Sequence, residues 1–301
     1  MKTRKILAAL LAVVCLFSTA ALLTSCFGAP AGGATLVYTL NDDGSSYSVT
    51  GIECDKNAVN ISIEIPETYE GMPVTAVGDQ AFLRCYELIS VSFPASIQVI
   101  GKEAFRQCNL ETINFHADGE LIEIGQFAFA NCPMTSITIP SSVETIADDA
   151  FYNCNYMATV TFAADSQLKQ IGARAFWMCG LTSITLPKSV TAIKEDAFNG
   201  CFKLETVTLE EGSMLETIGA NTFNRCAKLK SFTFPTSMKK ISTGVFYECT
   251  ALETVTFENP NGWRVNTESF ETSDGEPATL SDPAANAALM KEHYIYRWLH
   301  N

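Results

Sequence analysis

Residues 175–187 read AFWMCGLTSITLP, and close copies of this stretch lie on both sides of it. Residues 150–162 read AFYNCNYMATVTF, and residues 197–209 read AFNGCFKLETVTL. Each copy carries a Phe and, three positions later, a Cys. The Phe recurs every 22–25 residues, at Phe82, Phe105, Phe129, Phe151, Phe176, Phe198, Phe223 and Phe246. A period in this range is typical of solenoid proteins, which stack one short unit many times.

Each copy predicts one strand and then a second, shorter one. In residues 204–209, LETVTL, the apolar Val207 and Leu209 are two apart and share one face of a strand. Ile193 and Ile218 mark the shorter strand, and residues 194–201, KEDAFNGC, are expected to form one or two helical turns. A single coil cannot bury its apolar face, whereas stacked coils bury it against their neighbours.

The two ends of the repeat array need caps. Residues 36–52, LVYTLNDDGSSYSVTGI, predict a β-hairpin with an Asp-Gly turn. Near the C-terminus, Ser281 or Asp282 is expected to cap a helix that has Pro283 at its first position. The apolar residues expected to cover the last coil are Ala287, Leu289, Met290, Tyr294 and Trp298.

The repeated pattern A-F-x-x-C-x-x-L-x-x-I/V-x-L/F-P resembles the BspA-type leucine-rich repeat of bacterial surface proteins. The resemblance covers residues 74–257, about eight coils, and the flanks are similar to those of lipoproteins in this group. It implies an α/β repeat fold: a right-handed leucine-rich-repeat solenoid with a parallel sheet. We expect an N-terminal β cap at residues 35–73, and a degenerate last coil near Phe270 with a helical cap at 258–301. Roles reported across the family are adhesion and host-protein binding.

The first 34 residues predict export rather than fold. Lys2, Arg4 and Lys5 precede an uncharged stretch, residues 6–23, as in a secretory signal. Residues 23–26, LTSC, resemble a bacterial lipobox, so residues 1–25 are predicted to be a lipoprotein signal and Cys26 the lipidated residue. Residues 26–34 are then a flexible tether, and the protein is lipid-anchored to a bacterial membrane at the cell surface. The alternatives are plain secretion and a retained transmembrane helix, because 18 apolar residues just span a bilayer.

Eleven cysteines in an exported chain suggest disulfides, but their spacing favours a stacked ladder of reduced thiols. The Cβ atoms of neighbouring coils should be as far apart as the coils, beyond the usual disulfide range. Some disulfide pairing and metal binding remain the alternatives, and Cys54 is expected to be a lone buried thiol. The predicted ladder comprises Cys85, Cys108, Cys132, Cys154, Cys179, Cys201, Cys226 and Cys249.

The connectors after the predicted strands alternate between short and long. Proline cannot donate to a strand ladder, so the short connectors should end their strands at Pro94, Pro140, Pro187 and Pro235. The long connectors should form an acidic ridge on every other coil, built from Asp118, Glu120, Asp165, Glu210 and Glu211. This ridge is read as solvated turns, with ligand contact and calcium binding as alternatives.

Outward-facing strand positions form columns along the predicted sheet. Two columns consist almost entirely of Ser and Thr, and a third, one position earlier, is mixed in charge. Exposed Thr also simply suits a strand, because it is β-branched. The functional hypothesis is a docking face for an extracellular protein or glycan. Its candidate contacts are Thr182, Thr185, Glu205, Thr208, Lys230 and Glu253.

Charge and motifs narrow the function. A net charge of −13 argues against nucleic acid as a partner. No nucleophile-elbow, zinc-protease, phosphate-loop or dinucleotide motif is present, so we expect neither an enzyme nor a cofactor. The sequence therefore favours a surface-anchored binding or adhesion module. A structural protein of the envelope without an external ligand is the alternative, and a surface hydrolase is a remote one.

Overall fold

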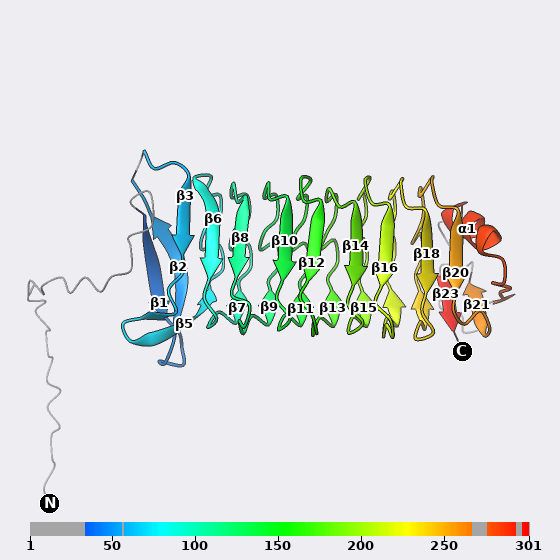
Figure 1. Cartoon of the computed structure of the whole chain (residues 1–301), viewed down its shortest axis with the longest axis horizontal. Coiled ribbons are helices and arrows are strands. Elements are labelled where there is room, and N and C mark those ends of the chain that lie inside the picture. Colours follow the sequence, from blue (N-terminus) through cyan, green and yellow to red (C-terminus); the bar gives the residue numbers. More distant parts are fainter. Residues whose placement is uncertain (1–33, 56, 267–275, 293–296, 301) are drawn as a thin grey trace, which may run out of the picture.

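The computed structural model describes residues 34–55, 57–266, 276–292 and 297–300. Over these residues the chain winds into a stack of coils with a β-rich N-terminal end, and α1 (Pro283–Glu292) lies at the other end (Figure 1). The signal segment, Cys26 and the degenerate copy near Phe270 fall outside the described residues.

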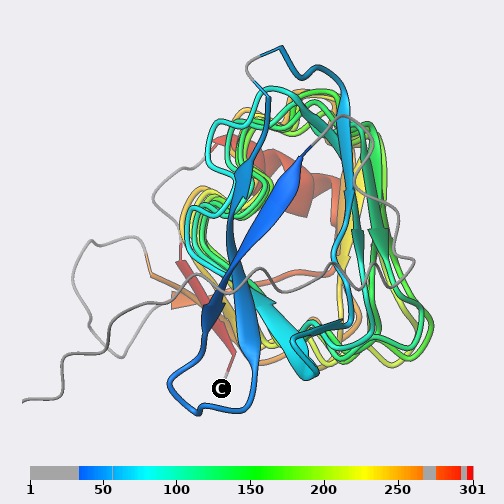
Figure 2. The same ribbon diagram turned by 90° about the vertical axis from the view of Figure 1, so that its left-hand side faces the viewer.

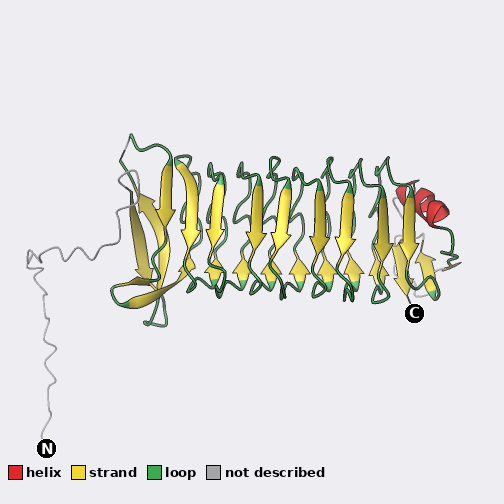
Figure 3. Ribbon diagram, viewed as in Figure 1, coloured by secondary structure: helices red, strands yellow, loops and turns green. Residues whose placement is uncertain are grey.

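Every coil contributes a longer strand to one side of the stack and a two-residue strand to another (Figure 3). Viewed from the N-terminal end, the coils overlie one another (Figure 2). We call the first side the long-strand face. Its strands are β6 (Leu88–Phe93), β8 (Thr112–Phe115), β10 (Ser136–Ile139), β12 (Thr159–Phe162), β14 (Ser183–Leu186), β16 (Thr206–Leu209), β18 (Ser231–Phe234) and β20 (Thr254–Phe257).

The short strands form one continuous parallel ladder, which we call the short-strand sheet. Each pairs with the equivalent residues of the next coil, as Ile146 does with Ile171 and Ile171 with Ile193. These isoleucines are buried, so the ladder also carries an apolar column. Its strands are β7 (Val99–Ile100), β9 (Glu123–Ile124), β11 (Thr145–Ile146), β13 (Gln170–Ile171), β15 (Ala192–Ile193), β17 (Thr217–Ile218) and β19 (Lys240–Ile241).

The predicted N-terminal hairpin is confirmed as β1 (Thr35–Leu40) paired antiparallel with β2 (Tyr47–Glu53). Its turn is held by Asp43, whose Oδ1 accepts the Ser45 N–H at 2.8 Å; this hydrogen bond lowers the pKa of Asp43. The hairpin joins the short-strand sheet through β5 (Met72–Val77), which pairs with β2 and β7. Two further strands complete this end: β3 (Ile61–Glu64), which pairs with β6, and β4 (Thr68–Tyr69), which pairs with β5.

The predicted C-terminal helix is also confirmed. Asp282 caps it, because its Oδ1 accepts the N–H groups of Ala284 at 2.9 Å and Ala285 at 3.2 Å. The helix buries Ala287 and Met290 against the last coil. Trp298 is buried too, but it lies in β23 (Arg297–His300), which pairs antiparallel with β19 and with β21 (Trp263–Asn266). The remaining strand, β22 (Glu276–Pro277), pairs with β21.

The segments expected to form helical turns are not helical. Within this segment, residues 195–200 form hydrogen-bonded turns, with Asp196 at a φ of 57°. The Asp196 N–H donates to the Ala220 carbonyl of the next coil at 2.8 Å, and the Phe198 N–H donates to the Thr222 carbonyl at 2.9 Å. A helix would need these groups for bonds within its own coil. The prediction was wrong because stacking gives the N–H groups a partner that no isolated coil offers.

The repeated phenylalanines form a parallel stack through the interior. From Phe82 to Phe246, successive rings have centroids 4.8–5.7 Å apart and planes within 4–11° of each other. All eight rings are buried, at no more than 1% exposure. Each ring therefore fills the space between two coils, and the core is shared along the whole stack.

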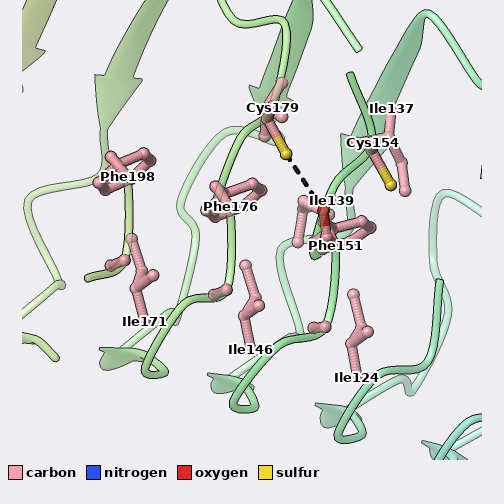
Figure 4. Close-up of a cluster of buried hydrophobic side chains, with 14 of the residues drawn as sticks. Ile124, Ile137, Ile139, Ile146, Phe151, Cys154, Ile171, Phe176, Cys179 and Phe198 are labelled. Atoms are coloured by element: carbon pink, nitrogen blue, oxygen red, sulfur yellow. Dashed lines mark hydrogen bonds between the residues drawn. The ribbon is translucent and has the colours of Figure 1, made fainter. Parts of the chain in front are cut away.

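The cysteines stand in a second column beside the rings, which we call the sulfur column. From Cys108 onward each of the seven thiols is buried and donates to the carbonyl of the preceding coil's Phe, at 2.9–3.3 Å. Figure 4 shows one such bond, from Cys179 Sγ to the Phe151 oxygen. Burial raises the pKa of Cys201 to about 12 and that of Cys108 and Cys249 to the same value.

Two cysteines lie outside this buried set. Cys85, the first member of the predicted ladder, is only partly buried. Cys54 is exposed, so the expectation of a buried thiol there was wrong. It follows β2 in a connector of the N-terminal cap, where no preceding coil covers it.

Candidate binding face

All six predicted contact residues lie on the exposed side of the long-strand face. Strand β14 shows why: Ser183 and Thr185 are exposed while Ile184 and Leu186 are buried, as the period of two demands. Thr185 pairs in register with Thr208 on the next coil. The six exposed residues are Thr182, Thr185, Glu205, Thr208, Lys230 and Glu253.

The mixed column brings charges together between the coils of β16 and β18. Glu205 Oε1 lies 3.3 Å from Lys228 Nζ, and Glu205 Oε2 lies 3.9 Å from Lys230 Nζ. Lys228 was not among the predicted contacts, because it lies before β18 and outside the strand columns. Its contact with Glu205 on the preceding coil arises from the way the two coils stack. Because both ion pairs are exposed to solvent, they contribute little to stability.

The long-strand face is interrupted twice. It divides into β3-β6-β8, then β10-β12-β14-β16, then β18-β20 (Figure 1). Within the described residues no backbone hydrogen bond joins β8 to β10. Strands β16 and β18 are linked only where they begin, by the Lys230 N–H and the Glu205 carbonyl at 3.4 Å. Between β12 and β14 the ladder narrows to one pair, Thr159 with Ser183.

Each interruption opens as a groove. The first groove, between β8 and β10, has a volume of about 560 Å³ and is lined by hydroxyl, amide and aromatic groups, among them Thr112, Asn114, Phe115, His116, Ser136 and Thr138. The second groove, between β16 and β18, has a volume of about 420 Å³. It is more acidic, and its lining includes Thr206, Thr208, Glu210, Glu211, Thr233 and Glu258.

The grooves follow coils that carry long connectors, and hydrogen bonds explain the coincidence. Each long connector bonds back to the preceding short one: Glu120 N–H to the Ala95 carbonyl at 2.9 Å, and Met214 N–H to the Lys188 carbonyl at 2.9 Å. Glu210 Oε2 also accepts the Lys188 N–H at 2.9 Å. Coils are thereby tied in pairs, and the ladder weakens between pairs. The alternation of short and long connectors was readable in the sequence, but it predicted neither that the coils are tied in pairs nor that grooves open between the pairs.

The structure agrees with the sequence-based expectations for the strand ends and for the exposure of the acidic connector residues. Strands β6, β10, β14 and β18 each end directly before the proline of a short connector. The five acidic residues of the long connectors are all exposed. Across the part of the chain that the structure describes, no three His, Cys, Asp or Glu side chains are grouped so as to hold a metal ion. In the same residues, no helix is long and apolar enough to cross a bilayer.

Comparison with solved structures places the coils among known repeat proteins. A leucine-rich repeat protein of T. pallidum is 30% identical, with 64% of this chain and 87% of that chain covered and a TM-score of 0.57. The pneumococcal vaccine antigen PcpA shares the fold at 23% identity, with 76% and 70% covered and a TM-score of 0.59. No sequence among curated proteins matched the chain.

The family comparison covers most of the repeat array. The BspA type leucine rich repeat region, in six copies, matches residues 75–179 and 159–276. These matches span two thirds of the chain and include both grooves and all six predicted contact residues. The chain therefore belongs to the family of BspA-type leucine-rich repeat proteins.

Proposed function

We propose that this protein is held at the bacterial cell surface by a lipid on Cys26 and binds an extracellular protein or glycan through its long-strand face. Leucine-rich repeat proteins are typically binding modules rather than enzymes. One protein of the same fold is a vaccine antigen, which is in keeping with an exposed position on a cell. The basic and apolar N-terminal segment supports export.

The observation that carries the proposal is the charged stretch beside the second groove. Most of the long-strand face presents Ser and Thr, whose hydroxyls offer many similar, weak contacts. Glu205, Lys228 and Lys230 are gathered at one point of that face, directly before β16 and β18 begin and next to the residues that line the second groove. Complementary charges give an interface its orientation and partner choice more than its raw affinity. We therefore place the specific contacts here and the general ones along the hydroxyl columns.

The groove adds shape to this charge pattern. A flat sheet can only be covered, whereas a groove of about 420 Å³ admits a side chain or a sugar ring between two coils. Glu210 and Glu211 stand at its end, on the long connector after β16. The ligand we expect is extended along the stack and projects one polar group between β16 and β18.

The test is a binding assay with residues 34–301 as bait, against purified host matrix proteins and bacterial surface polysaccharides. A triple charge reversal, Glu205→Lys with Lys230→Glu and Glu253→Lys, should lower affinity for the captured ligand at least tenfold. The matched control exchanges Glu216 and Lys239, which pair at 2.7 Å between the same two coils but beside the short-strand sheet. The control should bind like wild type. Equal binding by all three proteins would refute the site, and capture of no ligand would favour the envelope role.

A further inference from the structure

Two of the nine cysteines in the described residues differ from the rest by their access to solvent. Seven are buried, while Cys85 is partly buried and Cys54 is exposed. A thiol reacts as its thiolate and must be reached by its partner, so the buried seven are inert. Within the described residues, redox chemistry is therefore confined to Cys54 and Cys85.

Cys85 is accessible because it begins the sulfur column. Every later thiol bonds to the Phe carbonyl of the coil before it, as Cys108 does with Phe82 at 2.9 Å. The coil of Phe82 is the first of the repeat array, so no preceding coil supplies a Phe carbonyl as hydrogen-bond acceptor for Cys85. The sulfur instead lies 4.0 Å from Glu87 Oε2. The column thus ends in a thiol that faces the N-terminal cap.

The cap carries Cys54 across that end. Gly51, which precedes Cys54, lies close to the first coil: a Cβ added to Gly51 would be 3.9 Å from the Ala81 carbonyl oxygen. After Cys54, the Ile61 N–H donates to the Glu87 carbonyl at 2.7 Å. The connector between β2 and β3 therefore spans the turn that holds Cys85.

The electrostatics of Cys85 agree with this placement. Burial raises the pKa of the Cys85 thiol, and the charges of Glu87 and Cys54 raise it further. Charges affect a pKa in this way over short distances only. Cys54 lies in an irregular connector with an exposed side chain, so it can adjust its position to meet Cys85.

We propose that Cys54 and Cys85 form a disulfide that fastens the N-terminal cap to the first coil in an oxidising compartment. The exposed Cys54 thiolate attacks the S–S bond of a disulfide oxidant, forming a mixed disulfide and releasing one thiol. The Cys85 thiolate then attacks the Cys54 sulfur and releases the second thiol. The two cysteines lose two protons and two electrons, and the oxidant is reduced to two thiols. The bond joins positions 54 and 85 and so encloses β3, β4 and β5.

The experiment uses the purified chain with Cys15→Ser and Cys26→Ser, which keeps the nine cysteines of the described residues; the protein is reduced and then treated with oxidised glutathione. Free thiols are alkylated in denaturant, and the peptides are mapped without reductant. We expect one cross-linked pair, Cys54 with Cys85, while the seven buried cysteines stay alkylatable. A glutathione adduct on Cys54 with Cys85 still free, or a cross-link to any other cysteine, would overturn the proposal.

A stability measurement provides an independent readout. Reduction should lower the Tm of the oxidised wild type by several degrees, because the cross-link restricts the unfolded chain. Cys54→Ser changes an exposed residue and should show no such response to reductant. Cys201→Ser is the matched control: it removes a buried thiol, leaves the proposed pair intact and should keep the response. A reductant-sensitive Tm in Cys54→Ser would contradict the assignment.

Discussion

The short-strand sheet and the long-strand face are built from the same coils, yet only the first is continuous. Strands β7 to β19 pair without interruption, whereas the long strands separate after β8 and after β16. The phenylalanine stack and the sulfur column cross both interruptions. At the first interruption, the ring centroids of Phe105 and Phe129 lie 5.3 Å apart. At the second, the Cys226 thiol donates a hydrogen bond to the Phe198 carbonyl at 3.3 Å. One side of the molecule thus holds the stack together while the other is free to vary.

The difference between the two sides teaches where a repeat protein can accommodate a site. Backbone bonds lost between β16 and β18 are tolerated because each coil is still joined to its neighbour at the short strands, the turns and the core. Stability in such arrays is carried by nearest-neighbour interfaces, and each interface here has several parts. The opening therefore costs little, and it leaves polar groups facing a groove.

The largest effect is expected where the continuous side is broken. A Cβ at Gly219, just after β17, would lie 2.3 Å from the Glu195 nitrogen and 2.4 Å from the Lys194 carbonyl carbon. Gly219→Ala forces two coils apart and should lower the free energy of unfolding by about 3 kcal/mol. Urea titration measures the change.

The matched substitution lies on the other side of the same coil. Gly212, in the long connector after β16, has a φ of 76°, and a Cβ added there would meet no atom within 4 Å. Gly212→Ala should cost only about 1 kcal/mol, from backbone strain. Equal losses in the two variants would show that the two sides contribute alike.

The pH dependence of stability tests whether the thiols of the sulfur column are buried and protonated in the folded protein. An unfolded Cys has a pKa of about 8.5, and burial raises that of Cys201 to about 12. Between these values the unfolded chain has lost the proton and the folded chain has kept it. Below about pH 8.5 the thiol does not change the free energy of unfolding. Between about pH 8.5 and 12 the free energy of unfolding falls as pH rises, by about 1.4 kcal/mol per pH unit for each such thiol.

Cys201→Ala removes one such contribution. The variant should be less stable than wild type at pH 7, and the gap should shrink by about 1.4 kcal/mol for each pH unit above 9. Urea titrations at pH 7, 9 and 10 measure it. A gap that stays constant with pH would mean that the thiol is not held protonated inside the fold.

The smallest effect is expected on the interrupted side. Glu205→Gln removes the exposed pairs with Lys228 and Lys230 and should change the free energy of unfolding by less than about 0.5 kcal/mol. The change should vanish in 1 M salt, which screens exposed charges. A loss above 1 kcal/mol would assign these charges a role in stability and weaken their role in binding.

Local patterns predicted much of this molecule. The alternation in residues such as Ser183 and Ile184 is set by strand geometry, so the buried and exposed sides were readable in advance. Pro187 ends its strand and Asp282 caps its helix for equally local reasons. Three features depend on neighbouring coils and could not be predicted from local sequence patterns. They are the turn at Asp196, the ion pair of Glu205 with Lys228, and the exposure of Cys54.

The amino-acid order by itself determined the repeat length, the inward Phe and Cys, and the outward Ser and Thr, because each follows from the spacing of residues along one coil. Only the tertiary structure decided which coils pair and where the long-strand face opens. Every coil has two neighbours with nearly the same groups to offer, and the connectors, which bond back to the preceding coil, settle the choice between them. That choice involves hydrogen bonds between residues more than twenty positions apart, which no single repeat contains.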